Sequence, residues 1–141
     1  MPKIITKSAG ETRTLGKKLA AACRGGEIFG LTGDLGAGKT CLAQGFGSGL
    51  GIKSIINSPT FIIMRVHSIR GRGAVKKFCH IDAYRLKTAA DLEAIGAREY
   101  FGRPDTVVLI EWAEKIKKIW PKKIQLIRME HLDGDRRKII Y

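Results

Sequence analysis

The chain carries an octapeptide, Gly33-Asp34-Leu35-Gly36-Ala37-Gly38-Lys39-Thr40, directly after an apolar run at 28–32. The octapeptide matches G-x-x-x-x-G-K-[ST], a pattern in which a glycine-rich loop joins a strand to a helix and binds phosphate. Glycines let the backbone curl so that successive N–H groups point inward. The positive N-terminal end of the following helix adds to the attraction for anions. We therefore predict a buried strand at 28–32, a phosphate-binding loop at 33–38 and a helix from Lys39 to about Leu50.

Each residue type in this segment has an expected task toward bound ATP. The ammonium of Lys39 is expected to reach the β- and γ-phosphates, and the hydroxyl of Thr40 to ligate Mg²⁺. Cys41 stands where phosphate-loop proteins often carry a hydroxyl that bonds the α-phosphate. A thiol is a weaker donor, and an inert, packed cysteine is the alternative. The residues of this segment expected to contact the nucleotide are Gly33, Asp34, Leu35, Gly36, Ala37, Gly38, Lys39, Thr40 and Cys41.

Two carboxylates follow apolar runs elsewhere in the chain. Glu111 comes directly after the run 107–110, and burying an unpaired glutamate is costly. We therefore expect Glu111 to hold Mg²⁺ or to orient the attacking water. Asp82 is a second candidate, but from its spacing it could equally be an ordinary strand-end aspartate paired with Arg85. His80 is interpreted as structural, because one histidine near one aspartate is weak evidence for a metal site.

The rest of the pattern alternates between strand and helix signals. Ser8 and Glu11 have the spacing of a capping box that starts a helix, and the apolar run 106–110 is typical of a strand buried on both faces. The sequence predicts one domain over residues 1–141, an α/β three-layer P-loop NTPase-like fold with a mixed, partly parallel sheet. The other predicted elements are an edge strand at 3–6, hairpins formed by 61–69 with 74–81 and by 123–130 with 136–141, and short helices at 88–96 and 113–119.

Composition bounds the class of protein. The 141 residues are 44% hydrophobic and 28% charged, which is typical of a globular domain that buries its own core. Neither a membrane-spanning run nor a secretory signal is visible, so no membrane contact and a cytoplasmic location are expected. The net charge of +13, from 26 Lys and Arg against 13 Asp and Glu, favours polyanionic partners. A host whose proteins are generally basic is the open alternative.

Four motifs follow one another along nearly the whole chain. They are the phosphate loop at 33–40, Ser58-Pro59-Thr60-Phe61, His80-Ile81-Asp82-Ala83-Tyr84-Arg85-Leu86 and Ile110-Glu111-Trp112-Ala113-Glu114. In this order they resemble the TsaE family, the bacterial ATPases required for threonylcarbamoyladenosine modification of tRNA. The chain departs from the family at Cys41, where a second threonine is usual, and this puts the α-phosphate contact in question.

The resemblance implies an ATPase that works with a threonylcarbamoyltransferase subunit and its paralogous partner (TsaD-like and TsaB-like). ATP hydrolysis would reset that complex between turnovers, while the transfer to the adenosine next to the anticodon (t6A37) would be carried out by those two subunits. Contact with tRNA through the complex is left open. Carried over by position, Thr40 and Glu111 would hold Mg²⁺, and Asp82 would position or activate water. Thr60 would sense the γ-phosphate, Trp112 would line the nucleotide site and Arg136 would approach the base.

Two other functions stay open from the residues alone. One is a small P-loop phosphotransferase, although a lid-length insert bearing arginines is not visible. The other is a clamp that binds ATP and a partner without hydrolysis. Substitution of Glu111 distinguishes a clamp from an ATPase. A clamp would lose little function on Glu111→Gln, whereas an ATPase switch would stall.

Overall fold

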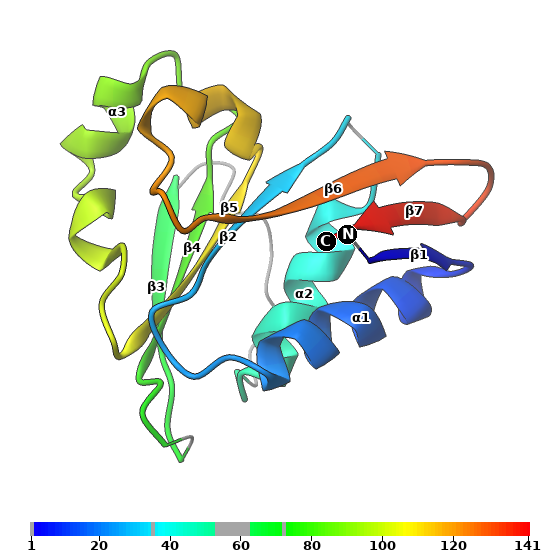
Figure 1. Cartoon of the computed structure of the whole chain (residues 1–141), viewed down its shortest axis with the longest axis horizontal. Coiled ribbons are helices and arrows are strands. Elements are labelled where there is room, and N and C mark those ends of the chain that lie inside the picture. The colour runs from blue at the N-terminus through cyan, green and yellow to red at the C-terminus, as the bar shows by residue number, and fades with distance from the viewer. Residues whose placement is uncertain (1, 35, 53–62, 72) are drawn as a thin grey trace.

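The computed structural model describes residues 2–34, 36–52, 63–71 and 73–141. These residues form a seven-stranded sheet in the order β1-β7-β6-β2-β5-β4-β3 (Figure 1). The elements in chain order are β1 (Lys3–Thr6), α1 (Ala9–Ala21), β2 (Ile28–Thr32), α2 (Lys39–Gly49), β3 (Met64–Ser68), β4 (Lys77–Asp82), α3 (Ala89–Ala94), the 3₁₀-helix η1 (Ala97–Tyr100), β5 (Thr106–Glu111), the 3₁₀-helix η2 (Ala113–Ile119), β6 (Gln125–His131) and β7 (Arg137–Ile140).

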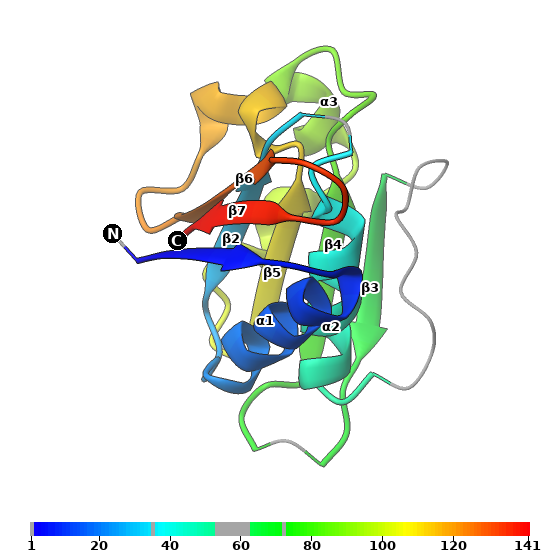
Figure 2. The ribbon, with the colours of Figure 1, turned by 90° about the vertical axis from the view of Figure 1, so that its right-hand side faces the viewer.

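The centre of the sheet is parallel and its margins are antiparallel. Strand β2 pairs in parallel with β5 and β6, and β5 pairs in parallel with β4. At the margins β3 runs against β4, β7 against β6, and β1 against β7 (Figure 2). The prediction of an α/β fold with a mixed, partly parallel sheet is therefore confirmed.

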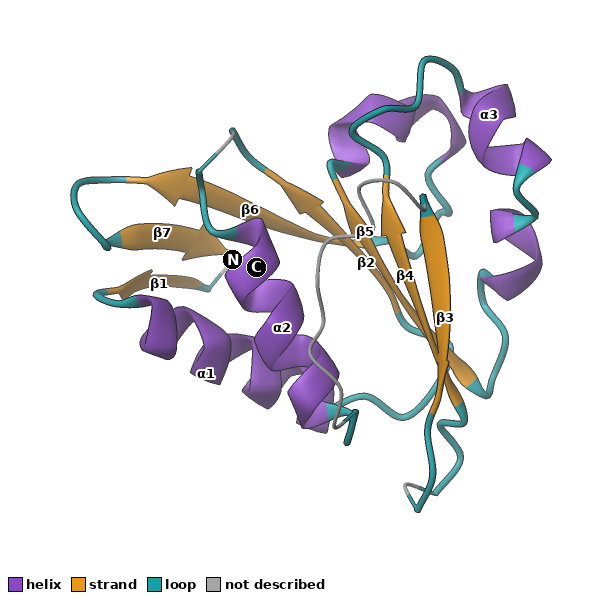
Figure 3. Cartoon of the chain, turned by 180° about the vertical axis from the view of Figure 1, so that it is seen from behind, coloured by secondary structure: helices purple, strands orange, loops and turns teal. Residues whose placement is uncertain are grey.

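Helical segments cover both faces of the sheet. Helices α1 and α2 lie together on one side, and α3, η1 and η2 lie on the other (Figure 3). Two groups of buried side chains follow this division. One group joins Leu15 and Phe46 of the paired helices to Phe78 and Leu109, and the other joins Ile81 and Ile110 to the opposite layer. Because side chains alternate along a strand, the central strands β2, β4 and β5 contribute to both groups and are buried along most of their length.

Glycines in α2 have a packing reason that propensity alone does not show. Gly45 and Gly49 lower the helix propensity of this segment, yet both lie where α1 and α2 approach closely. A Cβ atom added at Gly45 would overlap the carbonyl oxygen of Arg13, and one added at Gly49 would meet that of Lys17. The close approach brings the two helices to one face of the sheet and thereby fixes the direction in which α2 leaves the loop.

The helix boundaries differ in detail from the expectation. Ser8 caps α1 through its Oγ, which accepts from the Glu11 N–H at 3.1 Å, but the Glu11 carboxylate accepts from Lys7 rather than from Ser8. The helix expected at 88–96 ends at Ala94, because Gly96 takes a left-handed φ of 77° and η1 begins after it. The segment expected as a helix at 113–119 is a 3₁₀-helix. None of the described helices has the length and apolar character needed to cross a bilayer.

The glycine contact between the two helices can be tested by stability. We expect Gly45→Ala to lower the free energy of unfolding by about 1–3 kcal/mol, because the new methyl group is forced against backbone. The control is Gly10→Ala in the first turn of α1, where a Cβ would meet only Ser8 Oγ at 3.7 Å. That change should be neutral or stabilising by up to about 1 kcal/mol. Urea unfolding measures both, and equal effects of the two substitutions would contradict the packing account.

Candidate functional site

The glycine-rich loop leaves β2 and enters α2 through left-handed backbone. Gly33, Gly36 and Gly38 have φ values of 144°, 82° and 95°, which side chains with a Cβ rarely adopt. Gly38 is the N-terminal cap of α2, and Lys39 and Thr40 form the first turn of that helix. The predicted order of strand, loop and helix is confirmed at these positions. Leu35 and the predicted Ser58-Pro59-Thr60-Phe61 motif lie outside the described residues.

Lys39 is folded back over the loop that precedes it. Its ammonium donates to the carbonyl oxygens of Gly33 and Asp34, the latter at 2.9 Å, and lies 3.6 Å from the centroid of the Trp112 ring. The residue is only 6% exposed. Burial lowers the pKa of Lys39, and the carboxylates of Glu114 and Glu111 oppose that effect. A partly desolvated cation is therefore held at the floor of the loop, where an anionic ligand would gain from it.

Glu111 and Thr40 meet at the mouth of the loop. Glu111 ends β5, is 2% exposed, and its Oε1 accepts from the Thr40 hydroxyl at 3.5 Å. Its other oxygen, Oε2, lies 2.6 Å from Nε2 of His80. Asp82 ends the neighbouring strand opposite Glu111 in the parallel register, and its Oδ1 accepts from the Tyr84 N–H at 2.9 Å. The structure thus brings the two predicted carboxylates together beside the predicted metal-binding hydroxyl.

The donor set suits Mg²⁺ bound together with a nucleotide. Hydroxyl and carboxylate oxygens, as in Thr40 and Glu111, are the hard ligands that this ion prefers. Among the described residues, no group of three or more His, Cys, Asp and Glu side chains could hold a metal ion. In nucleotide sites Mg²⁺ is commonly held by one or two protein oxygens and by phosphates, rather than by a cage made of protein alone.

Trp112 has an unusual backbone directly after Glu111. Within the described part of the chain it is the only non-glycine residue with positive φ, at 57°. Its ring packs against the ring of Tyr84, with centroids 4.8 Å apart, and faces the ammonium of Lys39. Backbone strain of this kind costs about 1–3 kcal/mol and gathers at functional sites. The turn at Trp112 connects β5 to η2 and places the indole ring beside the loop.

These residues enclose a cavity of about 480 Å³, which we call the loop cavity. Its volume lies within the range of about 300–1,000 Å³ that is usual for small-molecule sites. Cys41 contributes to this cavity, and its Sγ lies 3.9 Å from Nη1 of Arg13. Cys79 lies elsewhere in the core, where burial raises the pKa of its thiol to about 12. The lining residues are Gly36, Ala37, Gly38, Lys39, Thr40, Cys41, Asp82, Tyr84, Glu111, Trp112 and Arg137.

Arg137 lines the loop cavity, whereas the arginine that the sequence pointed to does not. Arg136 is exposed and pairs with Asp133 at 3.2 Å. Arg137 places Nε beside Gly38, and within the described part of the chain this buried nitrogen has no hydrogen-bond partner. The two-residue alternation of side chains along a strand predicts the inward position of Arg137, because Arg137 shares a face of β7 with the buried Ile139.

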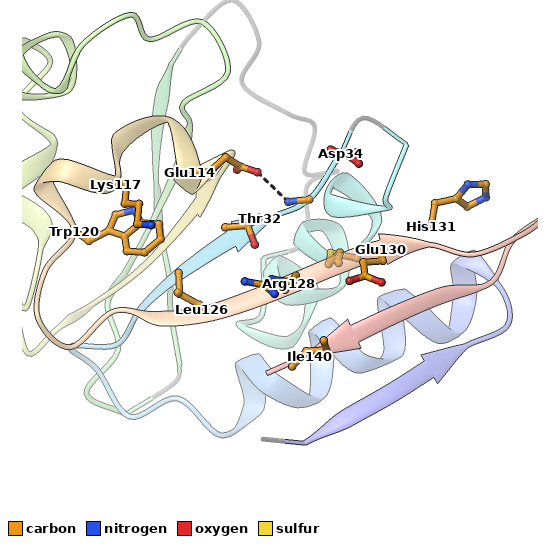
Figure 4. Close-up of a pocket in the computed structure, with 12 residues that line it drawn as sticks. Thr32, Asp34, Glu114, Lys117, Trp120, Leu126, Arg128, Glu130, His131 and Ile140 are labelled. Atoms are coloured by element: carbon orange, nitrogen blue, oxygen red, sulfur yellow. Dashed lines mark hydrogen bonds between the residues drawn. The ribbon is translucent and has the colours of Figure 1, made fainter.

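A larger cavity of about 980 Å³ lies on the other side of Gly33, between η2 and β6 (Figure 4). Glu114 reaches the loop from this side, and its Oε2 accepts from the Gly33 N–H at 3.1 Å. The described residues that line this cavity include neither Lys39, Thr40 nor Glu111. Its charged side chains have both signs: Lys117 and Arg128 against Asp34, Glu114 and Glu130. The predicted site residues Lys39, Thr40 and Glu111 therefore line the smaller loop cavity and not the larger one.

The chain matches a family model over residues 6–139, and that model describes TsaE, threonylcarbamoyl adenosine biosynthesis protein. A tRNA threonylcarbamoyladenosine biosynthesis protein TsaE from Streptomyces coelicolor is 40% identical over 87% of this chain and 81% of its own length. Proteins of the same name from Bacillus subtilis and Treponema pallidum are 37% and 35% identical, covering 93% and 95% of this chain and 78% and 96% of their own lengths.

Comparison of structures agrees with comparison of sequences. A crystal structure of Bacillus subtilis YdiB superposes with a TM-score of 0.79 at 33% identity, covering 98% of this chain and 82% of that one. The family model spans nearly every element described above, from the end of β1 into β7. The chain belongs to the TsaE family, and these relatives are named for tRNA threonylcarbamoyladenosine biosynthesis.

Proposed function

We propose that this chain binds ATP with Mg²⁺ in the loop cavity and hydrolyses it in support of tRNA threonylcarbamoyladenosine formation. The observation that carries the proposal is the meeting of the Thr40 hydroxyl and the Glu111 carboxylate, 3.5 Å apart, beside the buried ammonium of Lys39. These groups supply the cation and the oxygen ligands that phosphoryl transfer needs. The sequence motif alone supplies only the loop and leaves the carboxylate unplaced.

Each side chain has a separate task in this mechanism. Lys39 exchanges its two backbone carbonyl acceptors for the β- and γ-phosphate oxygens of ATP, while the loop N–H groups hold the phosphate chain. Thr40 and Glu111 would hold Mg²⁺, which when bound neutralises the charge that develops on the phosphates. Asp82, at the neighbouring strand end, orients the attacking water. Trp112 closes the side of the cavity next to Lys39, which limits the access of bulk water.

The family assignment supplies the biological setting. Because the relatives are named for tRNA threonylcarbamoyladenosine biosynthesis, we infer that ATP hydrolysis here resets a threonylcarbamoyltransferase complex made by a TsaD-like subunit and its TsaB-like partner. The transfer chemistry lies in the TsaD-like subunit of that complex, not in this chain. The free chain should hydrolyse ATP slowly, and the partner subunits should raise the rate.

Reconstitution with the partner subunits tests the proposal. We expect this chain to turn a single round of tRNA modification into many rounds, and Lys39→Ala or Glu111→Gln to lower that gain by about 10²-fold or more, because both act on charge that develops in the transition state. The measured quantity is the number of modified tRNAs per complex. Lys118→Ala and Glu99→Gln are matched controls on exposed residues.

Two outcomes would redirect the assignment. If modification cycles equally well without this chain, the proposed role in turnover is wrong. If Glu111→Gln binds ATP and retains full modification, the chain is a nucleotide-dependent clamp rather than an ATPase.

Arg137 should contribute to nucleotide binding more than Arg136 does. Removal of a charged donor that faces a phosphate typically costs about 1.5–3 kcal/mol, so Arg137→Ala should weaken ATP binding by about 10- to 100-fold. Arg136→Ala should leave the affinity within about two-fold, because its guanidinium is paired with Asp133 at the surface. Titration of a fluorescent ATP analogue measures both. The reverse order of effects would instead support contact between Arg136 and the base.

A further inference from the structure

We propose that His80 is a positioning residue that orients the Glu111 carboxylate toward Thr40 and the metal site. The inference rests on the proposed function and adds to it a residue that the sequence pattern marks only as structural. Its basis is the short contact between His80 Nε2 and Glu111 Oε2, at 2.6 Å, within a pair whose side chains are 1% and 2% exposed. A carboxylate only accepts, so Nε2 carries the hydrogen in this bond.

The two oxygens of Glu111 are thereby given different surroundings. Oε2 is held by His80 in the interior, and Oε1 faces the Thr40 hydroxyl at 3.5 Å on the side of the loop cavity. This hydrogen bond from His80 fixes the plane of the Glu111 carboxylate, because rotation about the Cγ–Cδ bond would break it. Hydrogen bonds to the atom of a metal ligand that does not touch the metal set the orientation of that ligand. Their loss typically lowers metal affinity by about 10- to 100-fold.

The imidazole is itself held by the sheet. His80 and Glu111 lie on adjacent parallel strands, two residues apart in the β4–β5 register, on the face that α2 covers. The ring stacks on Phe78 with centroids 5.7 Å apart and an interplanar angle of 13°. Phe78 also stacks against a second histidine, His67 of β3, with centroids 5.9 Å apart and an interplanar angle of 21°. The stacked rings constrain the plane of the His80 imidazole, and within that plane the observed flip points Nε2 at Glu111.

Two substitutions separate the donor from the stacked ring. His80→Gln loses the aromatic stack but keeps an N–H donor, because the glutamine amide nitrogen lies the same number of bonds from Cα as histidine Nε2. His80→Phe keeps the stack and removes the donor. A merely structural histidine predicts that phenylalanine is the better replacement, whereas a positioning histidine predicts that glutamine is. His67→Phe is the matched control, since this ring stacks on Phe78 from the opposite strand.

The experiment titrates Mg²⁺ into each protein in the presence of a fluorescent ATP analogue. We expect the half-saturating Mg²⁺ concentration to rise about 10-fold or more in His80→Phe and to stay within about three-fold of wild type in His80→Gln and His67→Phe. Binding of the analogue in EDTA should be unchanged in all of them, because the loop and Lys39 are intact. Thermal unfolding checks the fold of each variant. If His80→Phe does not fold, His80→Asn, whose amide is one bond too short, takes its place.

Each further result decides the question. Equal Mg²⁺ dependence of His80→Phe and wild type, or a larger defect in His80→Gln than in His80→Phe, overturns the positioning role and leaves the proposed function standing. Loss of analogue binding in EDTA to the same degree in both His80 variants also overturns it, because the effect would then be structural. A wild-type protein whose ATP binding does not respond to Mg²⁺ overturns the proposed function and this inference together.

Discussion

Glu111 lies buried at the end of a strand whose preceding residues, from Thr106 to Ile110, are buried as well. A carboxylate in such a place costs several kcal/mol unless it is paired and hydrogen-bonded. Its partners come from two other elements: His80 from β4 and Thr40 from the first turn of α2. The site therefore requires β4 and β2 to flank β5 in parallel, so that the strand ends and the loop meet at one edge of the sheet.

The same requirement explains features far from the cavity. Helix α2 must leave the loop in the direction that puts Thr40 next to Glu111, and its close packing against α1 fixes that direction. The packing is possible because Gly45 and Gly49 carry no Cβ atom. At the start of the loop, Glu114 of η2 accepts from the Gly33 N–H, so the segment after β5 also holds the loop in place. The glycines lower the helix propensity of α2, but they allow the close packing against α1 that positions its first turn.

Much of this arrangement could be predicted from the sequence because its signals are local. The octapeptide at 33–40 has a fixed spacing, and the apolar runs before it and before Glu111 mark buried strands. Asp82 is only one candidate from its place at a strand end, and the register of β4 and β5 puts it opposite Glu111. The family followed from the same short motifs in order, and comparison with TsaE proteins confirmed it.

Other features depend on contacts between distant segments and left no local signal. His80 resembles any buried histidine until its distance to Glu111 is known. Arg137 is the exception, because the two-residue period that it shares with the buried Ile139 distinguishes it from the exposed Arg136. The reason for Gly45 lies in the backbone of α1, which is far away in sequence. Thr60 lies outside the described part of the chain, so its role in sensing the γ-phosphate stays a prediction.

A crystal structure of this protein with Mg²⁺ and a non-hydrolysable ATP analogue would show where the nucleotide and the metal ion bind. We expect phosphates along the loop 33–40 and a metal ion about 2.1 Å from the Thr40 hydroxyl oxygen. The Glu111 carboxylate should contact that ion directly or through one water, with Lys39 turned from its backbone acceptors to the phosphates. A nucleotide seated instead in the larger cavity beside Trp120 and Arg128, or a metal ion remote from Glu111, would contradict the proposed binding of ATP and Mg²⁺ in the loop cavity.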